Sequence, residues 1–292
     1  MPFGAETHPV AESIRIVLGQ IGVAVFFIVS GFFYHREEGD AKTFWAKKWR
    51  GIVIPWMILS LCTYLFSVAI NKDASILAAL KWMFGVLTWY WYLPILLFMF
   101  VMFKGLQKKD VALVLCVIVM VLSVMLSAFG LIPYTIYFNQ YLNPLNWIGF
   151  FALGILIRKH GWLDELIGWR PTTMASLVFF VSIVLSVIYG QDKAYIDYFS
   201  LPCELSGGMI FLNLSVLLEN VGALKDIGRK SLFIYLVQMQ PAGIINTRLP
   251  YTPLFFILRP IIVLIVLYFI SLGIICLLKK AGLEKYSYII AL

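Results

Sequence analysis

Long apolar stretches alternate along the chain with short polar connections. The pattern predicts nine membrane-spanning helices, at residues 15–34, 52–71, 89–104, 111–129, 144–158, 173–190, 197–218, 231–247 and 254–278. Nearly every stretch is long enough, at about 1.5 Å per residue, to cross a hydrocarbon core of roughly 30 Å as a helix. The longest polar connection, 35–51, is too short for a soluble domain. We therefore expect a single all-α, membrane-embedded domain over residues 1–292.

The basic residues concentrate on alternate connections. Seventeen of the 23 Lys and Arg residues fall on one predicted side: Arg36, Lys42, Lys47, Lys48, Arg50, Lys104, Lys108, Lys109, Arg158, Lys159, Arg170, Lys225, Arg229, Lys230, Lys279, Lys280 and Lys285. Basic loops stay in the cytoplasm during insertion. The C-terminus is therefore expected inside and, because nine is odd, the N-terminus as given outside.

The composition agrees with a multi-pass protein of the cytoplasmic (inner) membrane. Hydrophobic residues make up 62% of the chain and charged residues 13%, and the mean hydropathy is +0.91. A soluble domain of this length needs far more polar surface. The topology accounts for the net charge of +8, so the expected partner is the lipid bilayer and no nucleic acid is required.

The four cysteines lie within predicted spans and form no CxxC pair, which indicates neither a disulfide framework nor a metal site. Cys203, beside Glu204, has two interpretations. One is a nucleophile, and the other, which we favour, is a small buried apolar residue.

Charged residues inside a membrane require an explanation, since each costs about 2.5–3.5 kcal/mol at a helix centre. Glu204 lies early in the seventh span and Arg259 early in the ninth. They either pair and hold two helices together, or line a polar cavity open to the outside. Other polar and aromatic side chains are expected at similar or somewhat deeper levels: Gln20, Trp89, Tyr90, Trp91, Tyr92, Gln238 and Gln240.

A basic, Trp-flanked segment, FWAKKWRGIVIPW at 44–56, leads directly into the second span. One interpretation is anchoring at the membrane interface together with the insertion rule. The other is a phosphate-binding patch on the cytoplasmic face, because Lys and Arg bind anions strongly.

Five segments occur in the order found in the membrane-bound acyltransferase family 3. They are IGVAVFFIVSGFFYH (21–35), KKWRGIVIPW (47–56), WYWYLPILL (89–97), GFFALGILI (149–157) and IGRKSLFIYLVQ (227–238). The chain resembles this family, which includes O-acetyltransferases that modify bacterial surface polysaccharides. The resemblance implies transfer of an acyl group from acyl-CoA, with acetyl-CoA the expected donor and no metal, to a hydroxyl of a sugar or envelope glycan.

The resemblance also suggests roles for particular side chains. A histidine at the outer end would remove the proton of the acceptor hydroxyl. Gln20, Ser30 or nearby tyrosines would stabilise charge on the thioester oxygen. The basic residues Lys47, Lys48 and Arg50 would bind CoA, with Arg158 and Lys159 as second candidates. Glu204 completes the candidate catalytic set, and the candidate substrate pocket comprises Trp89, Trp91, Tyr92, Gln238 and Arg259.

The chain departs from the family pattern at its start. Members have ten core helices, and the first carries the catalytic histidine, whereas the first span here is already the helix with the Ser-Gly motif. Either His8 is the equivalent histidine, or MPFG corresponds to residues that directly follow it, which places the histidine upstream of Met1; we favour the second. We therefore expect the chain to be N-terminally incomplete. The helix 231–247 carries Gln238 where relatives often have a histidine.

Two other functions also fit the spans. A transporter or flippase of a sugar or lipid-linked sugar accounts for the buried charges, although not for the ordered motifs. An inactive acyltransferase remnant is the third interpretation.

Overall fold

The computed structural model describes residues 9–34, 41–71, 74–86, 88–135, 137–189, 199–249 and 253–292. Within these ranges the regular structure is entirely helical, and the chain divides into two compact units. Among the described residues, the first unit comprises those within 41–94 and 219–292, and the second comprises those within 9–34 and 95–218. The predicted all-α class is confirmed.

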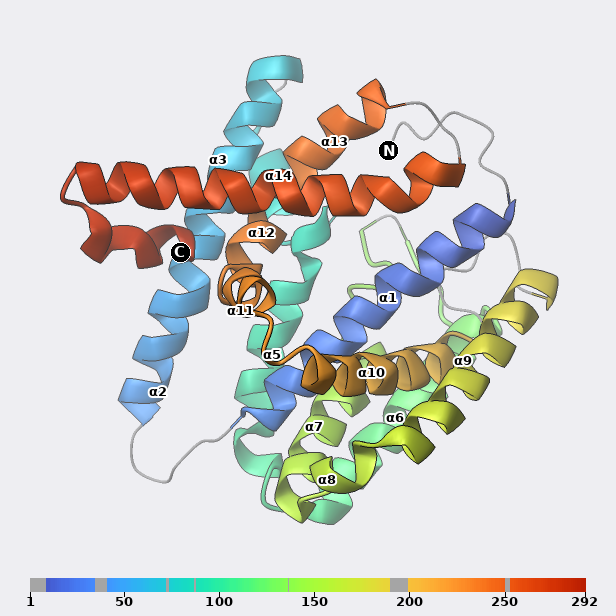
Figure 1. The fold of residues 1–292 in the computed structure, drawn as a ribbon. Helices are drawn as coiled ribbons and strands as arrows, with labels where there is room; N and C mark the ends of the chain where they lie inside the picture. The colour runs from blue at the N-terminus through green and yellow to red at the C-terminus, as the bar shows by residue number, and fades with distance from the viewer. Residues whose placement is uncertain are drawn as a thin grey trace. The chain divides into compact units, whose positions relative to one another are not determined.

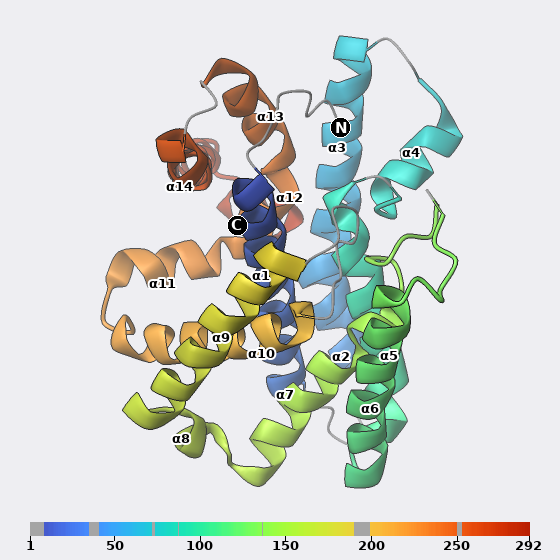
Figure 2. The same ribbon diagram turned by 90° about the vertical axis from the view of Figure 1, so that its right-hand side faces the viewer.

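The first unit is built around α3 (Figures 1 and 2). Its elements are α2 (Ala41–Lys48), the π-helix η1 (Trp49–Val53), α3 (Ile54–Asn71), α4 (Ile76–Met83), η2 (Trp89–Trp91), α11 (Gly222–Arg229), α12 (Ser231–Val237), α13 (Met239–Arg248), α14 (Pro253–Lys280) and η4 (Glu284–Ile290). Figure 2 shows α4 beside α3, where the Trp56 indole N–H donates to the Met83 carbonyl oxygen at 3.0 Å. The Tyr64 hydroxyl also donates to the Ser75 carbonyl oxygen at 2.8 Å, so two polar contacts hold α4 against α3.

The second unit contains the remaining elements. They are α1 (Pro9–Phe32), most of α5 (Tyr92–Leu106), α6 (Asp110–Ala128), η3 (Pro144–Asn146), α7 (Ile148–His160), α8 (Leu163–Leu166), α9 (Trp169–Tyr189) and α10 (Ser200–Leu217). Helix α1 packs on α7 and α10, and α7 also packs on α6. The centre of this unit is aromatic: Phe27, Phe150 and Phe151 are fully buried.

Two glycines allow α1 and α7 to approach closely. A Cβ atom at Gly31 would collide with the carbonyl of Phe151, and one at Gly154 would collide with the carbonyl of Ile28. Small residues let membrane helices pack backbone against backbone. Gly31 and Gly154 belong to two of the segments that carry the family resemblance, so the structure gives these motif glycines a packing role.

Six helices of the described residues are long and apolar enough to cross a membrane: Lys42–Ala69, Trp89–Leu106, Asp110–Ala128, Trp169–Ser186, Ser200–Leu217 and Leu258–Lys280. Each corresponds to a predicted span. The chain is thus a multi-pass membrane protein.

Three further predicted spans have different structures. The first span lies in α1, of which Ile21–Phe32 is recognised as a shorter apolar helix. The span 144–158 becomes α7, whose 13 residues extend about 20 Å. The span 231–247 divides into α12 and α13 at Gln238. Pro241 explains this division because it has no N–H to donate to the carbonyl of Val237, four residues earlier. The count of nine spans and the orientation of the C-terminus stay predictions.

Candidate functional site

The predicted donor patch lies in the first unit, where α2 continues through η1 into α3. The side chains of Lys47 and Arg50 are exposed, and the Lys48 ammonium lies 5.5 Å from the centroid of the Phe44 ring. A shallow surface pocket is lined by Trp45, Ala46, Trp49 and Arg50. Trp49 follows Trp45 by four residues, and Arg50 follows Ala46 by four, so the four side chains lie on one helix face. The patch thus combines an aromatic surface with a cation at its edge.

The π-helix sets the geometry of this patch. The N–H of Ile54 donates to the carbonyl of Trp49, five residues earlier. Pro55 follows directly and cannot donate to the carbonyl of Gly51. Short π segments of this kind concentrate at functional sites because they change the direction of nearby side chains. Here the π-helix ends at Val53, two residues before Pro55, and it carries Arg50.

The second predicted group of donor residues ends α7 in the second unit, and both of its cations bind protein oxygens. The Arg158 guanidinium donates to the carbonyl of Phe32, the last residue of α1, at 3.3 Å. A cation is favourable there because the last carbonyls of a helix carry partial negative charge. Arg158 therefore caps α1.

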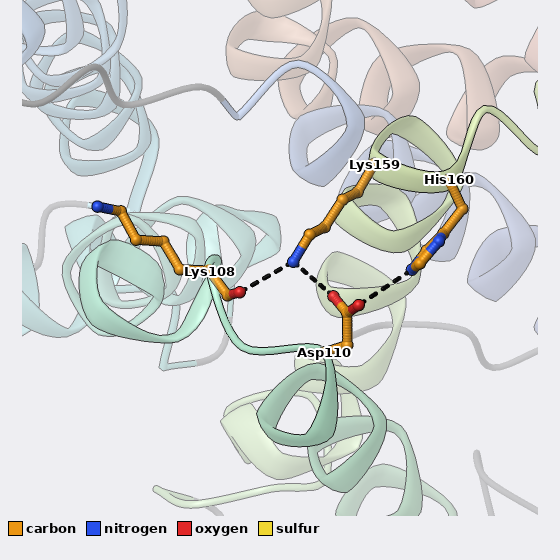
Figure 3. A network of polar contacts seen from close by, with 4 residues as sticks. All are labelled: Lys108, Asp110, Lys159 and His160. Atoms are coloured by element: carbon orange, nitrogen blue, oxygen red, sulfur yellow. Dashed lines mark hydrogen bonds and ion pairs between the residues drawn. The ribbon is translucent and has the colours of Figure 1, made fainter.

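Lys159 makes two contacts that tie α7 to the start of α6 (Figure 3). Its ammonium lies 2.6 Å from Asp110 Oδ1 and 2.9 Å from the carbonyl oxygen of Lys108. His160 Nε2 lies 3.4 Å from the other Asp110 oxygen, and its ring stacks on Trp162 at 4.9 Å between centroids. A phosphate at this place would compete with Asp110 for Lys159.

The predicted substrate-pocket residues lie in the first unit and separate into two groups. Trp91 and Tyr92 are buried, whereas the Trp89 side chain is 46% exposed. The hydroxyl of Tyr235 in α12 donates to the Trp89 carbonyl, and the Tyr92 ring packs edge-on against the Tyr235 ring. The structure thus brings the Trp/Tyr run and α12 together.

The two polar members of that set lie elsewhere in the same unit. Gln238 is half-buried and occupies the division between α12 and α13. The Arg259 guanidinium donates to the carbonyl of Leu249, just after α13, at 2.7 Å. Arg259 therefore fastens the start of α14 to the end of α13.

The sequence analysis placed Tyr90 and Gln240 in the polar and aromatic group but named neither as a site residue, and it did not consider Thr63 or Trp82. Tyr90 is fully buried; its hydroxyl donates to the carbonyl of Leu236 at 2.7 Å and lies 2.7 Å from the Thr63 hydroxyl. The Gln240 amide donates to the Thr63 carbonyl, and the Trp82 indole donates to the Thr63 hydroxyl, both at 3.3 Å. Tyr90 belongs to the Trp/Tyr run, but nothing in the sequence pairs it with Thr63 or Leu236.

The candidate catalytic residues that the structure describes belong to the second unit. Glu204 in α10 is 4% exposed, and Ser30 in α1 is half-buried. Gln20 lies in α1, but its side chain, like the whole of His8, lies outside the described residues. Helices α1 and α10 pack together, so Glu204 and Ser30 lie on neighbouring helices. Arg259 belongs to the other unit, and the predicted Glu204–Arg259 pair stays a prediction.

The cysteines and other possible metal ligands add no further candidate. Cys203 is 1% exposed and packs with Ile21, as the apolar interpretation predicts. Among the described residues, no group of three His, Cys, Asp or Glu side chains lies close enough to hold a metal ion.

The fold and the apolar helices define an all-α, multi-pass membrane protein. Comparison with protein families then gives the family: the model of the acyltransferase domain of family 3 matches residues 2–280, across both compact units. The chain belongs to this acyltransferase family, as the ordered motifs predicted. Searches of curated proteins and of solved structures gave no match.

Proposed function

We propose that this chain is an integral membrane O-acetyltransferase that moves an acyl group from acyl-CoA, foremost acetyl-CoA, to a hydroxyl of a cell-envelope glycan or other sugar. The family match over residues 2–280 carries this proposal. In the reaction the carbonyl carbon of the thioester forms a C–O bond with the acceptor, and its C–S bond breaks. The acceptor proton passes to a base, and the CoA thiolate takes up a proton.

The donor's phosphates are proposed to bind at Lys47, Lys48 and Arg50. Two of these cations are exposed, and the neighbouring pocket presents Trp45 and Trp49. Charge-assisted hydrogen bonds to phosphate are the strong ones among polar contacts. An aromatic surface beside them suits the adenine ring. The proposal places this face in the cytoplasm, where acyl-CoA is made, and the protein in the inner membrane.

The catalytic step needs a base and donors to the thioester oxygen. His8 and the buried Glu204 are the candidate bases in this chain, and Gln20 and Ser30 are the candidate donors. To act as the base, Glu204 must be a carboxylate when the acceptor hydroxyl arrives, so the proposal requires a hydrogen-bond donor or cation beside it. The acceptor sugar would contact the exposed ring of Trp89, whose backbone is fixed by Tyr235.

The test uses the full-length protein in liposomes with acetyl-CoA labelled in the acetyl group. We expect label to enter an added envelope-glycan fraction as an alkali-labile ester and free CoA to appear in equal amount. Protein that neither binds nor consumes acyl-CoA, but moves a sugar-lipid across the bilayer, would show that the chain is a transporter. Protein that does neither would leave the remnant interpretation.

A further inference from the structure

The chain folds back on itself after α14 (Figure 1). Gly282 makes the reversal possible, because its φ of +69° lies in the left-handed region that favours glycine. The N–H of Gly282 donates to the Lys279 carbonyl, and that of Leu283 donates to the Leu278 carbonyl. This is the Schellman pattern of a helix end. It directs η4 back along the first unit.

The returning segment lies beside the donor patch. Within the first unit, η4 contacts η1, α3 and α14. The ammonium of Lys279 lies 3.4 Å from Glu284, an exposed ion pair between the end of α14 and the first residue of η4. The element it reaches, η1, is the one that carries Trp49 and Arg50.

The exposed face of η4, like the donor patch, presents a cation beside aromatic rings. Ser287, Ile289 and Ile290 are half-buried, whereas Lys285, Tyr286 and Tyr288 are exposed. The Lys285 ammonium lies 4.9 Å from the centroid of the Tyr286 ring. Next to η1 the chain thus presents another cation over an aromatic ring.

We propose that η4 forms the second wall of the donor site, with Lys285 binding a phosphate of acyl-CoA and Tyr286 stacking on its adenine. The inference rests on the proposed function and extends its donor site to a segment 235 residues further along the chain than Arg50. Acyl-CoA carries a diphosphate, a ribose phosphate and an adenine. A site with cations and aromatic rings on two walls matches these groups, and cations on both walls can bind separate phosphates.

The experiment compares two donors on the full-length chain in liposomes. Acetyl-CoA carries the nucleotide, and acetyl-pantetheine lacks it. For Lys285→Gln we expect the KM for acetyl-CoA to rise about tenfold, the effect of losing one charge-assisted contact, with kcat unchanged. Tyr286→Ala should act in the same direction. Neither variant should alter the KM for acetyl-pantetheine.

Two further variants separate binding from folding. Lys285→Arg keeps the cation and should keep the KM of the wild type. Lys280→Gln, in the last turn of α14, removes an exposed cation near the tail and serves as the matched control. Equal losses with both donors would show a structural role and overturn the inference. An unchanged KM for acetyl-CoA in Lys285→Gln would overturn it and leave the proposed function standing. A wild type that uses neither donor would overturn both.

Discussion

The cations that precede α3 and those that end α7 differ in their surroundings. Lys159 is held by Asp110 and by a backbone carbonyl, and Arg158 is held by the end of α1. Within the described part of the chain, no ion pair or hydrogen bond involves the side chain of Lys47 or Arg50. Both clusters follow the positive-inside pattern equally well. The difference is an acidic residue, Asp110, at the start of the helix next to α7.

This difference bears on which cluster binds an anionic donor. A phosphate at Lys159 must displace the carboxylate of Asp110, whereas a phosphate at Arg50 replaces water. The exchange of one charged partner for another gains little, because both interactions are screened at an exposed site. The cluster before α3 is therefore the stronger candidate for the donor, and the cluster after α7 is the stronger candidate for holding helices together. Four variants, the first of them a triple substitution, test this assignment and the packing around it.

The largest effect is expected from replacing Lys47, Lys48 and Arg50 together by Gln. Each charge-assisted contact contributes at most about 1.5–3 kcal/mol, so losing three should raise the KM for acyl-CoA by two orders of magnitude or more. Initial rates against acyl-CoA concentration measure this, with membrane insertion checked by fractionation. The control removes the side-chain charges of Lys104, Lys108 and Lys109. Equal donor dependence in the two triple variants would show that the basic residues before α3 have no special role in binding the donor.

The second largest effect is expected from disturbing the close packing of α7, the helix that carries Arg158 and Lys159, against α1. In Gly154→Ala the new methyl group meets the backbone of Ile28, which cannot rotate away as a side chain can. Overpacking of this kind costs about 1–3 kcal/mol. We expect a lower thermal unfolding midpoint in detergent. Gly22→Ala, also in α1, is the matched control, because no heavy atom lies within 4 Å of its added Cβ. A stability of Gly154→Ala equal to that of Gly22→Ala would contradict the close approach of α1 and α7.

The sequence predicted those parts of the molecule that depend on local pattern. Apolar length predicted the six long helices, and the family motifs predicted the acyltransferase family. Contacts between distant residues were not predictable. Asp110 and Lys159 are 49 positions apart, and Tyr90 and Leu236 are 146 apart, so no periodicity relates them. The division of the span 231–247 did have a local signal in Pro241, but a proline within an apolar stretch also fits a kinked, continuous helix.

A smaller effect is expected when the ion pair after α7 is removed. Lys159 and Asp110 are both partly exposed, and exposed pairs are weak because water screens them. Lys159→Gln should therefore leave the KM for acyl-CoA within about twofold of the wild type, as an isolated surface pair implies. The same kinetic assay measures it. A rise comparable with that of the triple variant before α3 would show that Lys159 binds the donor and would reverse the assignment.

The smallest effect is expected in the pH dependence of the protein's stability. It concerns another paired cation, Lys230, which is buried and forms an ion pair with Asp226. The ion pair with Lys230 and a 2.8 Å hydrogen bond from Tyr268 hold the pKa of Asp226 below its ordinary value. Because this pKa is lower in the folded than in the unfolded chain, the charged carboxylate favours folding above about pH 4, the ordinary range for Asp. That stability is lost as the pH falls through the lowered pKa. Unfolding midpoints between about pH 6 and pH 2 should therefore drop less steeply in Asp226→Asn than in the wild type. Parallel curves would show that pairing with a carboxylate does not hold Lys230, and would weaken the same argument for Lys159.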